Sequence, residues 1–296
     1  MKYCISIFAL PHEIDDLEVT LTQLGKAFQY INQENFILDV TLGMSDNLVM
    51  WEQSKLPKEY FQDKFILLQN KCWWVDNKFF RLSEGEVQGC VSKRRQTWLD
   101  HKNVDYHIWL DTDIIFDERT LVYLDNVASQ LDDKHAVITP EIVKVWDNTW
   151  DCLVNEQFLD KPTDYQHTNN PFIDSGIKGD ISVETVVSGV PGQPTMKFAG
   201  GWFTCISRNI LDRLTVPEAF GHYGLEDTYL MQGLELLKLG TQYKIKNLVV
   251  CENYKFRNNV HITNYLASIS RKDEFLKIAQ SNFVKELEKV VQNTTF

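Results

Sequence analysis

The stretch "YHIWLDTDIIF", residues 106–116, decides how this chain is interpreted. Its apolar residues predict a buried strand, yet two aspartates, Asp111 and Asp113, stand one residue apart within it. A carboxylate in an apolar core is costly unless it is paired or bound to a cation. The pair therefore needs a physical reason, which we sought in the rest of the chain.

Strand-like and helix-like segments alternate before this stretch. Short apolar runs ending in turn residues predict strands, and apolar residues at helical spacing predict helices. The predicted elements are strands at 3–10, 36–47 and 64–70, and helices at 15–31 and 91–102. This alternation favours an α/β fold, a mostly parallel sheet flanked by helices.

The second half of the chain begins with a region of different character. Within residues 141–196, the stretch 158–180 is rich in Asn, Asp, Pro, Gly and Thr, which marks a loop, and a loop this long is often a lid or a substrate-binding segment. Regular elements then return. We predict a strand at 196–207, a short helix at 208–215, a helix at 225–240, a strand at 243–256 and a closing helix at 271–291.

Composition limits the class of protein. The net charge is −11, which argues against broad binding to nucleic acid or anionic lipid, although "SKRRQ" at 92–96 is a compact basic cluster. The six cysteines are scattered, and we expect them to be reduced, as in the cytoplasm. The N-terminus lacks a signal-peptide pattern, and no apolar run is long enough for a membrane helix.

The aspartate pair has one chemical interpretation and two simpler ones. Residues i and i+2 of a strand point to the same side, so Asp111 and Asp113 would project together near the strand's carboxyl end, where open α/β sheets bind ligands. Two carboxylates there suit a hard divalent cation such as Mg²⁺ or Mn²⁺. Alternatively, they cap a turn or pair with the basic cluster.

Two later segments add candidate residues. Gly200 and Gly201 interrupt a predicted strand, either as a bulge or because another group approaches the backbone closely, and Trp202 beside them offers a flat face to a sugar ring or to the core. Glu226 and Asp227 follow a glycine-flanked aromatic loop and open a helix. Acids there stabilise the helix, and they are also suited to act as a general base and a substrate-binding carboxylate.

Taken in order, "WLDTD", "FAGGWFTCISRNIL" and "YGLEDTYLMQGL" resemble the GT-A class of nucleotide-sugar glycosyltransferases. The nearest likeness is to the β-1,4-galactosyltransferase and chondroitin-polymerase type. The resemblance implies a single Rossmann-like GT-A domain over 1–296. Residues 1–116 would bind the nucleotide, and the loop-rich half, 117–296, would bind the acceptor.

The resemblance also implies roles for the acidic residues. Asp113 would be the main metal ligand, while Asp111 would contact the nucleotide, or the metal through water. His261 falls where the family often supplies a third metal ligand, and a mix of oxygen ligands with one imidazole favours Mn²⁺ over Mg²⁺. Asp227 would be the general base, and Glu226 would hold hydroxyls of the acceptor or donor.

Further donor and acceptor contacts follow from the same resemblance. The expected donor-side residues are Ala9, Leu10 and Pro11 at the base, Asp46 at the base or ribose, Arg94 or Arg95 at the diphosphate, and Gly200 and Gly201. Trp202 and Tyr223 would contact the acceptor sugar. The chain departs from the family at Leu225, where glycine is usual, and in 141–196, which has no counterpart; the lack of an anchor favours a bacterial or viral cytoplasmic enzyme.

The expected activity is metal-dependent, inverting transfer of a sugar from a nucleotide-sugar donor, most simply a UDP-sugar, to an acceptor hydroxyl. The acceptor stays open among a glycan, a lipid-linked sugar, a protein and a modified nucleic-acid base, the last being less expected from the net charge. Two alternatives stand beside this activity. One is a nucleotidyltransferase that makes sugar nucleotides, and the other is a non-catalytic sugar-binding module of the same fold.

Overall fold

The structure is a computed structural model that describes residues 1–46, 48, 51, 54–84, 89–112, 114–116, 118–131, 134–143, 181–182, 203–252 and 272–294. Its strands are β1 (Tyr3–Ala9), β2 (Phe36–Gly43), β3 (Lys78–Ser83), β4 (Tyr106–Leu110), β5 (Ile114–Phe116), β6 (Ala136–Val143), β7 (Ile181–Ser182), β8 (Phe203–Ser207) and β9 (Thr241–Glu252). Its α-helices are α1 (Ile14–Ala27), α2 (Lys58–Lys71), α3 (Cys90–Asp100), α4 (Thr120–Gln130), α6 (Arg208–Leu211), α7 (Glu226–Leu237) and α10 (Lys272–Thr294). Short 3₁₀ turns include η1 (Pro11–Glu13), η2 (Phe28–Tyr30), η3 (Gln33–Asn35) and η7 (Glu218–Phe220).

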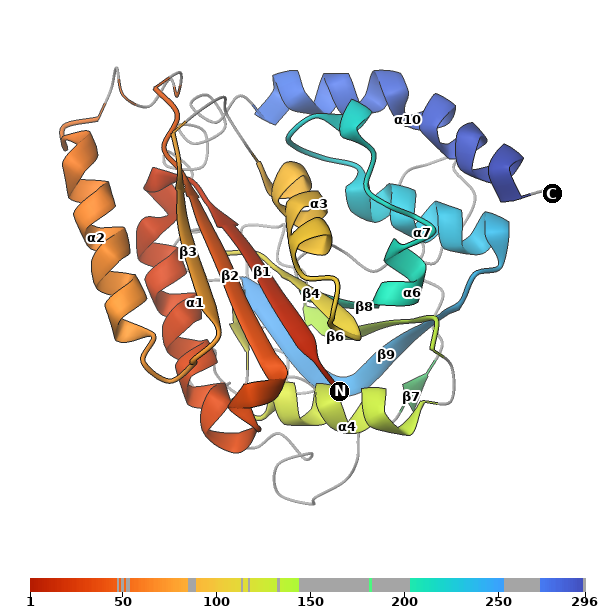
Figure 1. Cartoon of the computed structure of the whole chain (residues 1–296), viewed down its shortest axis with the longest axis horizontal. Coiled ribbons are helices and arrows are strands. Elements are labelled where there is room, and N and C mark those ends of the chain that lie inside the picture. The colour runs from red at the N-terminus through yellow and green to blue at the C-terminus, as the bar shows by residue number, and fades with distance from the viewer. Residues whose placement is uncertain are drawn as a thin grey trace.

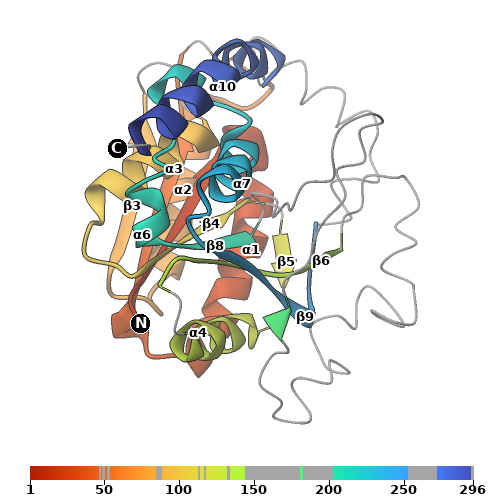
Figure 2. The same ribbon diagram turned by 90° about the vertical axis from the view of Figure 1, so that its right-hand side faces the viewer.

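Within these residues the strands form one sheet in the order β3-β2-β1-β4-β8-β6-β9-β5, with β7 beside β9 (Figures 1 and 2). The first four strands are parallel to one another. β8 enters antiparallel between β4 and β6, β9 runs parallel to β6, and β5 and β7 pair with β9 in antiparallel fashion. The α/β fold predicted from the alternating segments is confirmed.

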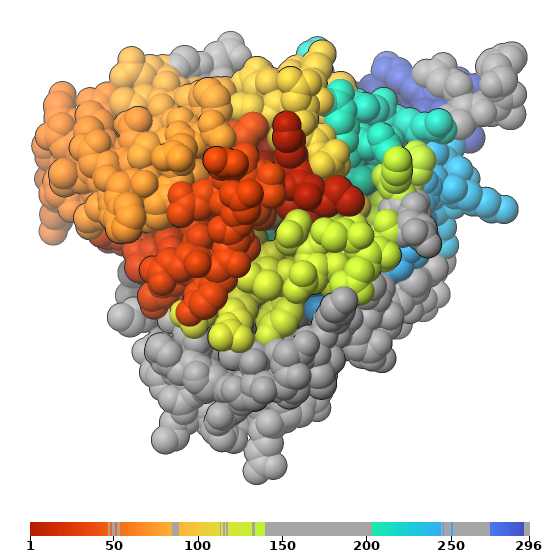
Figure 3. Space-filling model, turned by 60° about the horizontal axis from the view of Figure 1, so that its bottom comes forward, coloured from red at the N-terminus to blue at the C-terminus, as the bar shows by residue number. Residues whose placement is uncertain are grey.

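Helices cover both faces of the sheet. Because successive side chains of a strand point to opposite faces, each strand contributes side chains to the core on either side of the sheet. In β4, Tyr106, Ile108 and Leu110 face a core that includes α1, α2 and α4, whereas Trp109 faces a second core formed with α3, α6 and α7. The space-filling view from below shows α4 lying beside the N-terminal residues of the chain (Figure 3). The opposite edge, at the top of Figure 1, carries the carboxyl ends of the parallel strands.

The prediction of a strand at 64–70 is wrong, because this segment belongs to helix α2. Its run of apolar residues is typical of a buried strand, but only a helical subset of the apolar residues is buried. Phe61, Phe65 and Leu68 face the core, while Ile66 is 47% exposed and Leu67 is 59% exposed. The strand that follows α2 is β3, which the sequence did not reveal, and α4 and β6 were also unforeseen.

The stretch 106–116 is two strands rather than the predicted single one. β4 ends at Leu110, and the chain resumes as β5 at Ile114, which pairs with β9 instead of with a neighbour of β4. Asp111 therefore follows the end of a strand instead of lying inside one. Within the described residues, the structure confirms the predicted helices around α1, α3, α6, α7 and α10 and the strands β1, β2, β8 and β9.

Candidate active site

The carboxyl edge of the parallel strands holds the first group of the candidate site. β1 and β4 are adjacent and parallel, with Ile7 opposite Leu110, so the segments that follow them leave the sheet at the same edge. After β4 comes Asp111, whose side chain is 34% exposed. β1 ends at Ala9, which is buried like Leu10 and Pro11 after it, and the backbone amide of Leu10 donates to the Glu13 carboxylate at 2.7 Å.

Helix α3 brings Arg94 to this edge. Its guanidinium lies over the ring of Trp109, with 4.9 Å from Cζ to the ring centroid. Nη2 donates to Oδ1 of Asp111 at 2.9 Å, and Nη1 pairs with Oε1 of Glu226 at the start of α7. One guanidinium thus joins a strand end to a helix start that is distant in the sequence, because its planar fork can serve two carboxylates at once.

Burial sets the charges of this group. Arg94 and Glu226 are 6% and 5% exposed. Burial raises the pKa of Glu226, against the opposing effect of the Arg94 charge. Burial alone would lower the pKa of Arg94, but Glu226, Asp111 and Asp227 among its neighbours raise it, so the guanidinium stays charged. The exposed end of the group is Asp111.

A strained loop delivers Glu226 and Asp227. Gly221 and Gly224 have φ of 71° and 93°, and Leu225 has φ of 64°, a left-handed conformation that costs about 1–2 kcal/mol for a residue with a side chain. Helix α7 begins directly after Leu225. Asp227 is half-buried, and its Oδ1 accepts from the backbone amide of Thr228 at 2.6 Å. Asp227 therefore keeps more contact with solvent than Glu226.

The same loop packs on the first turn of α3. The backbone amide of Val91 donates to the carbonyl of His222 at 3.2 Å, and Nδ1 of His222 lies 3.3 Å from Oγ of Ser92. A Cβ on Gly89 would stand 2.1 Å from the His222 carbonyl oxygen, so only glycine fits there. Sγ of Cys90 lies 3.8 Å from Oε1 of Glu226. These residues were not predicted from the sequence, in which Gly89 ahead of a basic helix was the one available signal.

A buried network on the underside of α3 fixes the helix to the sheet. Asp39 in β2 is fully buried; it pairs with Nζ of Lys93, lies 2.7 Å from Nε2 of His101 and 3.3 Å from an Nη of Arg81. Burial alone would raise the pKa of Asp39, but the hydrogen bond with His101 and the charges of Lys93 and Arg81 hold it below its usual range. Lys93 thus anchors the helix that presents Arg94.

The other predicted site residues are placed as follows. Asp46 is exposed and pairs with Lys58 at 2.6 Å. Arg95 donates to the carbonyl of Pro217 at 3.2 Å, and Tyr223 packs partly buried against the larger core. Asp113, Gly200, Gly201, Trp202 and His261 lie outside the described residues. The structure therefore brings together Asp111, Arg94 and Glu226, with Asp227 next along the chain.

Three observations concern only the described part of the chain. It contains no cluster of three His, Cys, Asp or Glu side chains arranged to hold a metal ion. It contains no helix that is both long and apolar enough to cross a membrane. Among its cysteines, Cys4, Cys72, Cys90 and Cys205 are not joined by disulfide bonds.

Comparison with known proteins places the fold. No family model matches the sequence, and no curated protein matches it. Among solved structures, the chain is similar to the mannosyltransferase PcManGT from Pyrobaculum calidifontis, determined in complex with GDP-Man and Mn²⁺. The TM-score is 0.50 at 11% identity, over 99% of this chain and 72% of that chain.

It is also similar to S. aureus TarS residues 1–349, with a TM-score of 0.45 at 12% identity over 95% of this chain and 71% of that chain. The same TarS segment in complex with UDP gives a TM-score of 0.46 at 12% identity, over 96% and 72%. The likeness to PcManGT bears on the fold alone: this chain has an α/β fold similar to that of PcManGT.

Proposed function

We propose that this chain is a nucleotide-sugar glycosyltransferase that transfers a sugar to an acceptor hydroxyl with inversion at the anomeric carbon. One observation carries the proposal: Arg94 joins Asp111 to Glu226 at the edge where the parallel strands end. That edge is where open α/β sheets bind ligands. The convergence joins two of the three motifs that resemble the GT-A class, and the fold is similar to that of the mannosyltransferase PcManGT.

Asp227 is our candidate for the general base. Glu226 is almost fully buried and already paired with Arg94, so it is poorly placed to receive a proton from a substrate. Asp227 follows it on the same helix turn and is half-buried. In this assignment Arg94 and Glu226 position the start of α7, and Asp227 accepts the acceptor's proton.

The donor would bind along the carboxyl edge. Ala9, Leu10 and Pro11 would contact the base and Asp46 the base or ribose, with a UDP-sugar as the expected donor. Asp111 has carboxylate oxygens at the exposed end of the site, which fits a hard cation or a ribose hydroxyl. Mn²⁺ or Mg²⁺ would be held by Asp113, by His261 and by Asp111 through water. When bound, the ion would neutralise charge on the leaving diphosphate.

In the proposed reaction, the bond that forms is matched by one that breaks, and the proton released has an acceptor. The acceptor oxygen forms a bond to the anomeric carbon while the bond from that carbon to the diphosphate oxygen breaks, and the hydroxyl proton passes to Asp227. Attack from the face opposite the leaving group inverts the configuration. Trp202 and Tyr223 would stack on the acceptor, and Gly200 and Gly201 would allow close approach to the donor. Arg94, paired with two carboxylates, would reach the diphosphate only by exchanging one of them.

The test begins with a thermal-shift panel of nucleotide sugars, with and without Mn²⁺, because a ligand that binds the native state raises its stability. The donor found there is then used with a panel of acceptors. We expect Asp227→Asn to keep donor binding and to lower transfer by about 10²–10⁴-fold. Glu235→Gln is the matched control, an exposed acid on the same helix, and its rate should equal that of the wild type.

Each outcome bears on a separate part of the proposal. Near-normal transfer by Asp227→Asn would exclude that residue as the base. Asp113→Ala should abolish the Mn²⁺-dependent part of donor binding, and unchanged binding would refute the metal assignment. A product with retained anomeric configuration would refute the inverting mechanism. If no nucleotide sugar stabilises the protein, the glycosyltransferase proposal itself is wrong.

A further inference from the structure

The outer faces of α1 and α2 enclose two adjoining hollows that play no part in the proposed site. Each has a volume of about 290 Å³. One is lined by residues including Gln29, Gln33 and Trp73, and the other by residues including Tyr60 and Leu67. Glu18, Leu68 and Lys71 line both hollows, so they form one continuous seam between the helices.

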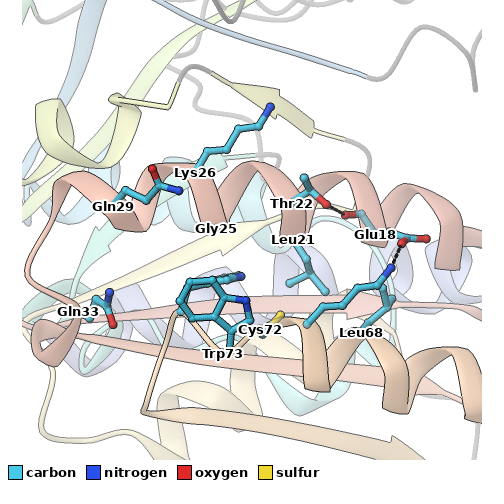
Figure 4. Close-up of a pocket in the computed structure, with 12 residues that line it drawn as sticks. Glu18, Leu21, Thr22, Gly25, Lys26, Gln29, Gln33, Leu68, Cys72 and Trp73 are labelled. Atoms are coloured by element: carbon cyan, nitrogen blue, oxygen red, sulfur yellow. Dashed lines mark hydrogen bonds and ion pairs between the residues drawn. The ribbon is translucent and has the colours of Figure 1, made fainter.

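Trp73 is the main feature of this seam. It follows α2, and 79% of its surface is exposed, whereas its neighbour Trp74 is buried against Phe28 with ring centroids 4.7 Å apart. Figure 4 shows Trp73 with Gln29 and Gln33 around the first hollow. An exposed indole offers a flat apolar face, and each amide offers both a donor and an acceptor. This combination suits a sugar ring, which presents C–H groups on its faces and hydroxyls around its edge.

The charges in the seam favour a neutral ligand. The Glu18 carboxylate pairs with Lys71 and lies 3.5 Å from Nζ of Lys64, and Lys64 also pairs with Asp15. Lys26 and Asp63, which also line the hollows, carry opposite charges, so the three acidic and three basic groups of the seam have no net charge. A neutral, hydroxyl-rich ligand would meet amides and aromatic rings without having to break these pairs.

The seam is long, and one end lies toward the proposed site. A helical rise of 1.5 Å per residue puts Tyr60 and Lys71 roughly 16 Å apart along α2, and Trp73 lies just beyond the end of that helix. α2 follows β2, so its first turn, which carries Tyr60, lies toward the carboxyl edge of the sheet, and Trp73 lies toward the opposite edge (Figure 1). This length fits several linked sugar residues better than a single one.

We propose that the seam between α1 and α2 binds a neutral saccharide chain, which stacks on Trp73 and Tyr60 and is hydrogen-bonded by Gln29 and Gln33. This binding is argued from the seam alone. The identification of the bound chain as the acceptor, held while its end is extended at the carboxyl edge, rests on the proposed function.

The test measures binding of neutral hexasaccharides to the whole chain by isothermal titration calorimetry. The panel contains oligomers of β-1,4-glucose, α-1,4-glucose, β-1,4-xylose and β-1,4-N-acetylglucosamine, at millimolar concentration. We expect at least one to bind saturably, and Trp73→Ala to weaken it by about tenfold, the usual cost of removing one aromatic anchor. Trp73→Tyr should restore part of the affinity, and Gln33→Ala should weaken it less.

Phe79→Ala is the matched control. Phe79 is an exposed aromatic residue on β3 whose ring packs 5.0 Å from that of His101, at the end of α3 on the other side of the sheet. Its loss should leave saccharide affinity unchanged. Because Trp73 is so exposed, Trp73→Ala should fold normally, with an unchanged thermal midpoint.

Several outcomes would overturn the proposal. The first is that no saccharide of the panel binds saturably. The second is that Trp73→Ala and the wild type bind with equal affinity. The third is that the protein self-associates in sedimentation experiments and that this self-association depends on Trp73. The last would identify the seam as an interface between two copies. Binding is independent of turnover, so Trp73-dependent binding without any transfer would refute the proposed function and leave this site intact. With transfer present, Trp73→Ala should raise KM for long acceptors and leave kcat unchanged.

Discussion

At the scale of single residues, the Arg94 guanidinium holds two acidic segments of the candidate site together, because it contacts both Asp111 and Glu226. The cluster "SKRRQ" looks like a set of cations available to a diphosphate, and we predicted such a role for Arg94 or Arg95. In the structure, Lys93 and Arg94 are both buried on α3, Lys93 against Asp39 and Arg94 against Asp111 and Glu226. The partners come from three other elements, so only the tertiary structure reveals them.

His107, in β4, is a buried residue whose protonation would oppose folding. It is 1% exposed, and burial lowers its pKa from 6.5 to about 3, with the nearby His101 and Arg208 acting in the same direction. Between these two pH values the unfolded chain binds a proton that the folded chain does not. The free energy of unfolding therefore falls as the pH falls through this window. At pH 5 the loss from this residue is about 2 kcal/mol.

We therefore predict that His107→Gln has a shallower acid dependence than the wild type. The comparison is made by urea unfolding at pH 7 and pH 5, since other titrating groups contribute equally to both proteins. The difference between the two pH values should be smaller by about 2 kcal/mol in the variant. Identical pH slopes would mean that His107 has the same pKa in the folded and the unfolded chain, which would contradict the prediction.

At the scale of elements, short apolar runs were the weak point of the sequence analysis. Residues 64–70 have the composition of a strand, and their periodicity cannot distinguish a short buried strand from one turn of a helix. The exposure of Ile66 and Leu67 distinguishes a helix from a buried strand here, because a buried strand would not leave these side chains in solvent. The alternation of elements in the first half was sufficient to predict the α/β class despite this error.

At the scale of elements, the packing contact between α3 and the loop before α7 places the two segments of the candidate site against each other. Gly89→Ala would push its Cβ against the His222 carbonyl and separate the two segments. We predict a loss of about 1–3 kcal/mol of stability from the overpacking. Displacement of Glu226 and Asp227 should lower kcat on the order of a hundredfold. Thermal unfolding and steady-state transfer rates measure the two effects.

Gly240→Ala is the control for this variant. A Cβ on Gly240 would stand 1.9 Å from the carbonyl oxygen of His135, so its steric cost is similar, but it lies just before β9. It should lose stability while keeping the turnover of its folded fraction. Equal loss of turnover in both variants would show that the rate depends on stability and not on the contact between α3 and the loop at His222.

At the scale of the whole molecule, the fold was more predictable than the site. Most of the strands and helices follow from local sequence pattern, whereas the site depends on residues such as Asp111 and Glu226 that come together only after the sheet is complete. The order of the three motifs predicted that the second and third would join the first, and the structure brings the first and third together. For the second, Gly200–Trp202, the role stays a prediction.

The closing helix α10 links the second core to the loop that carries the acidic pair. Phe283 stacks on Phe220 of η7 with ring centroids 5.9 Å apart, and Nδ2 of Asn282 donates to the carbonyl of Ala219 at 3.0 Å. Phe275, in the first turn of α10, packs against His222 with ring centroids 5.1 Å apart. The helix thus supports η7 and the loop that leads into α7, in the half of the molecule assigned to the acceptor.

This arrangement predicts that the two halves respond differently to a change in α10. Phe283→Ala should cost roughly 2 kcal/mol, less than a fully buried phenylalanine because its ring is partly exposed. It should loosen η7 and the loop at 221–225, and so lower kcat while leaving donor affinity unchanged. Val284→Ala, at a 64% exposed neighbouring position, should change neither. If Phe283→Ala instead weakens donor binding as much as it lowers kcat, the two halves do not act separately. The assignment of nucleotide binding to residues 1–116 and of acceptor binding to residues 117–296 would then be wrong.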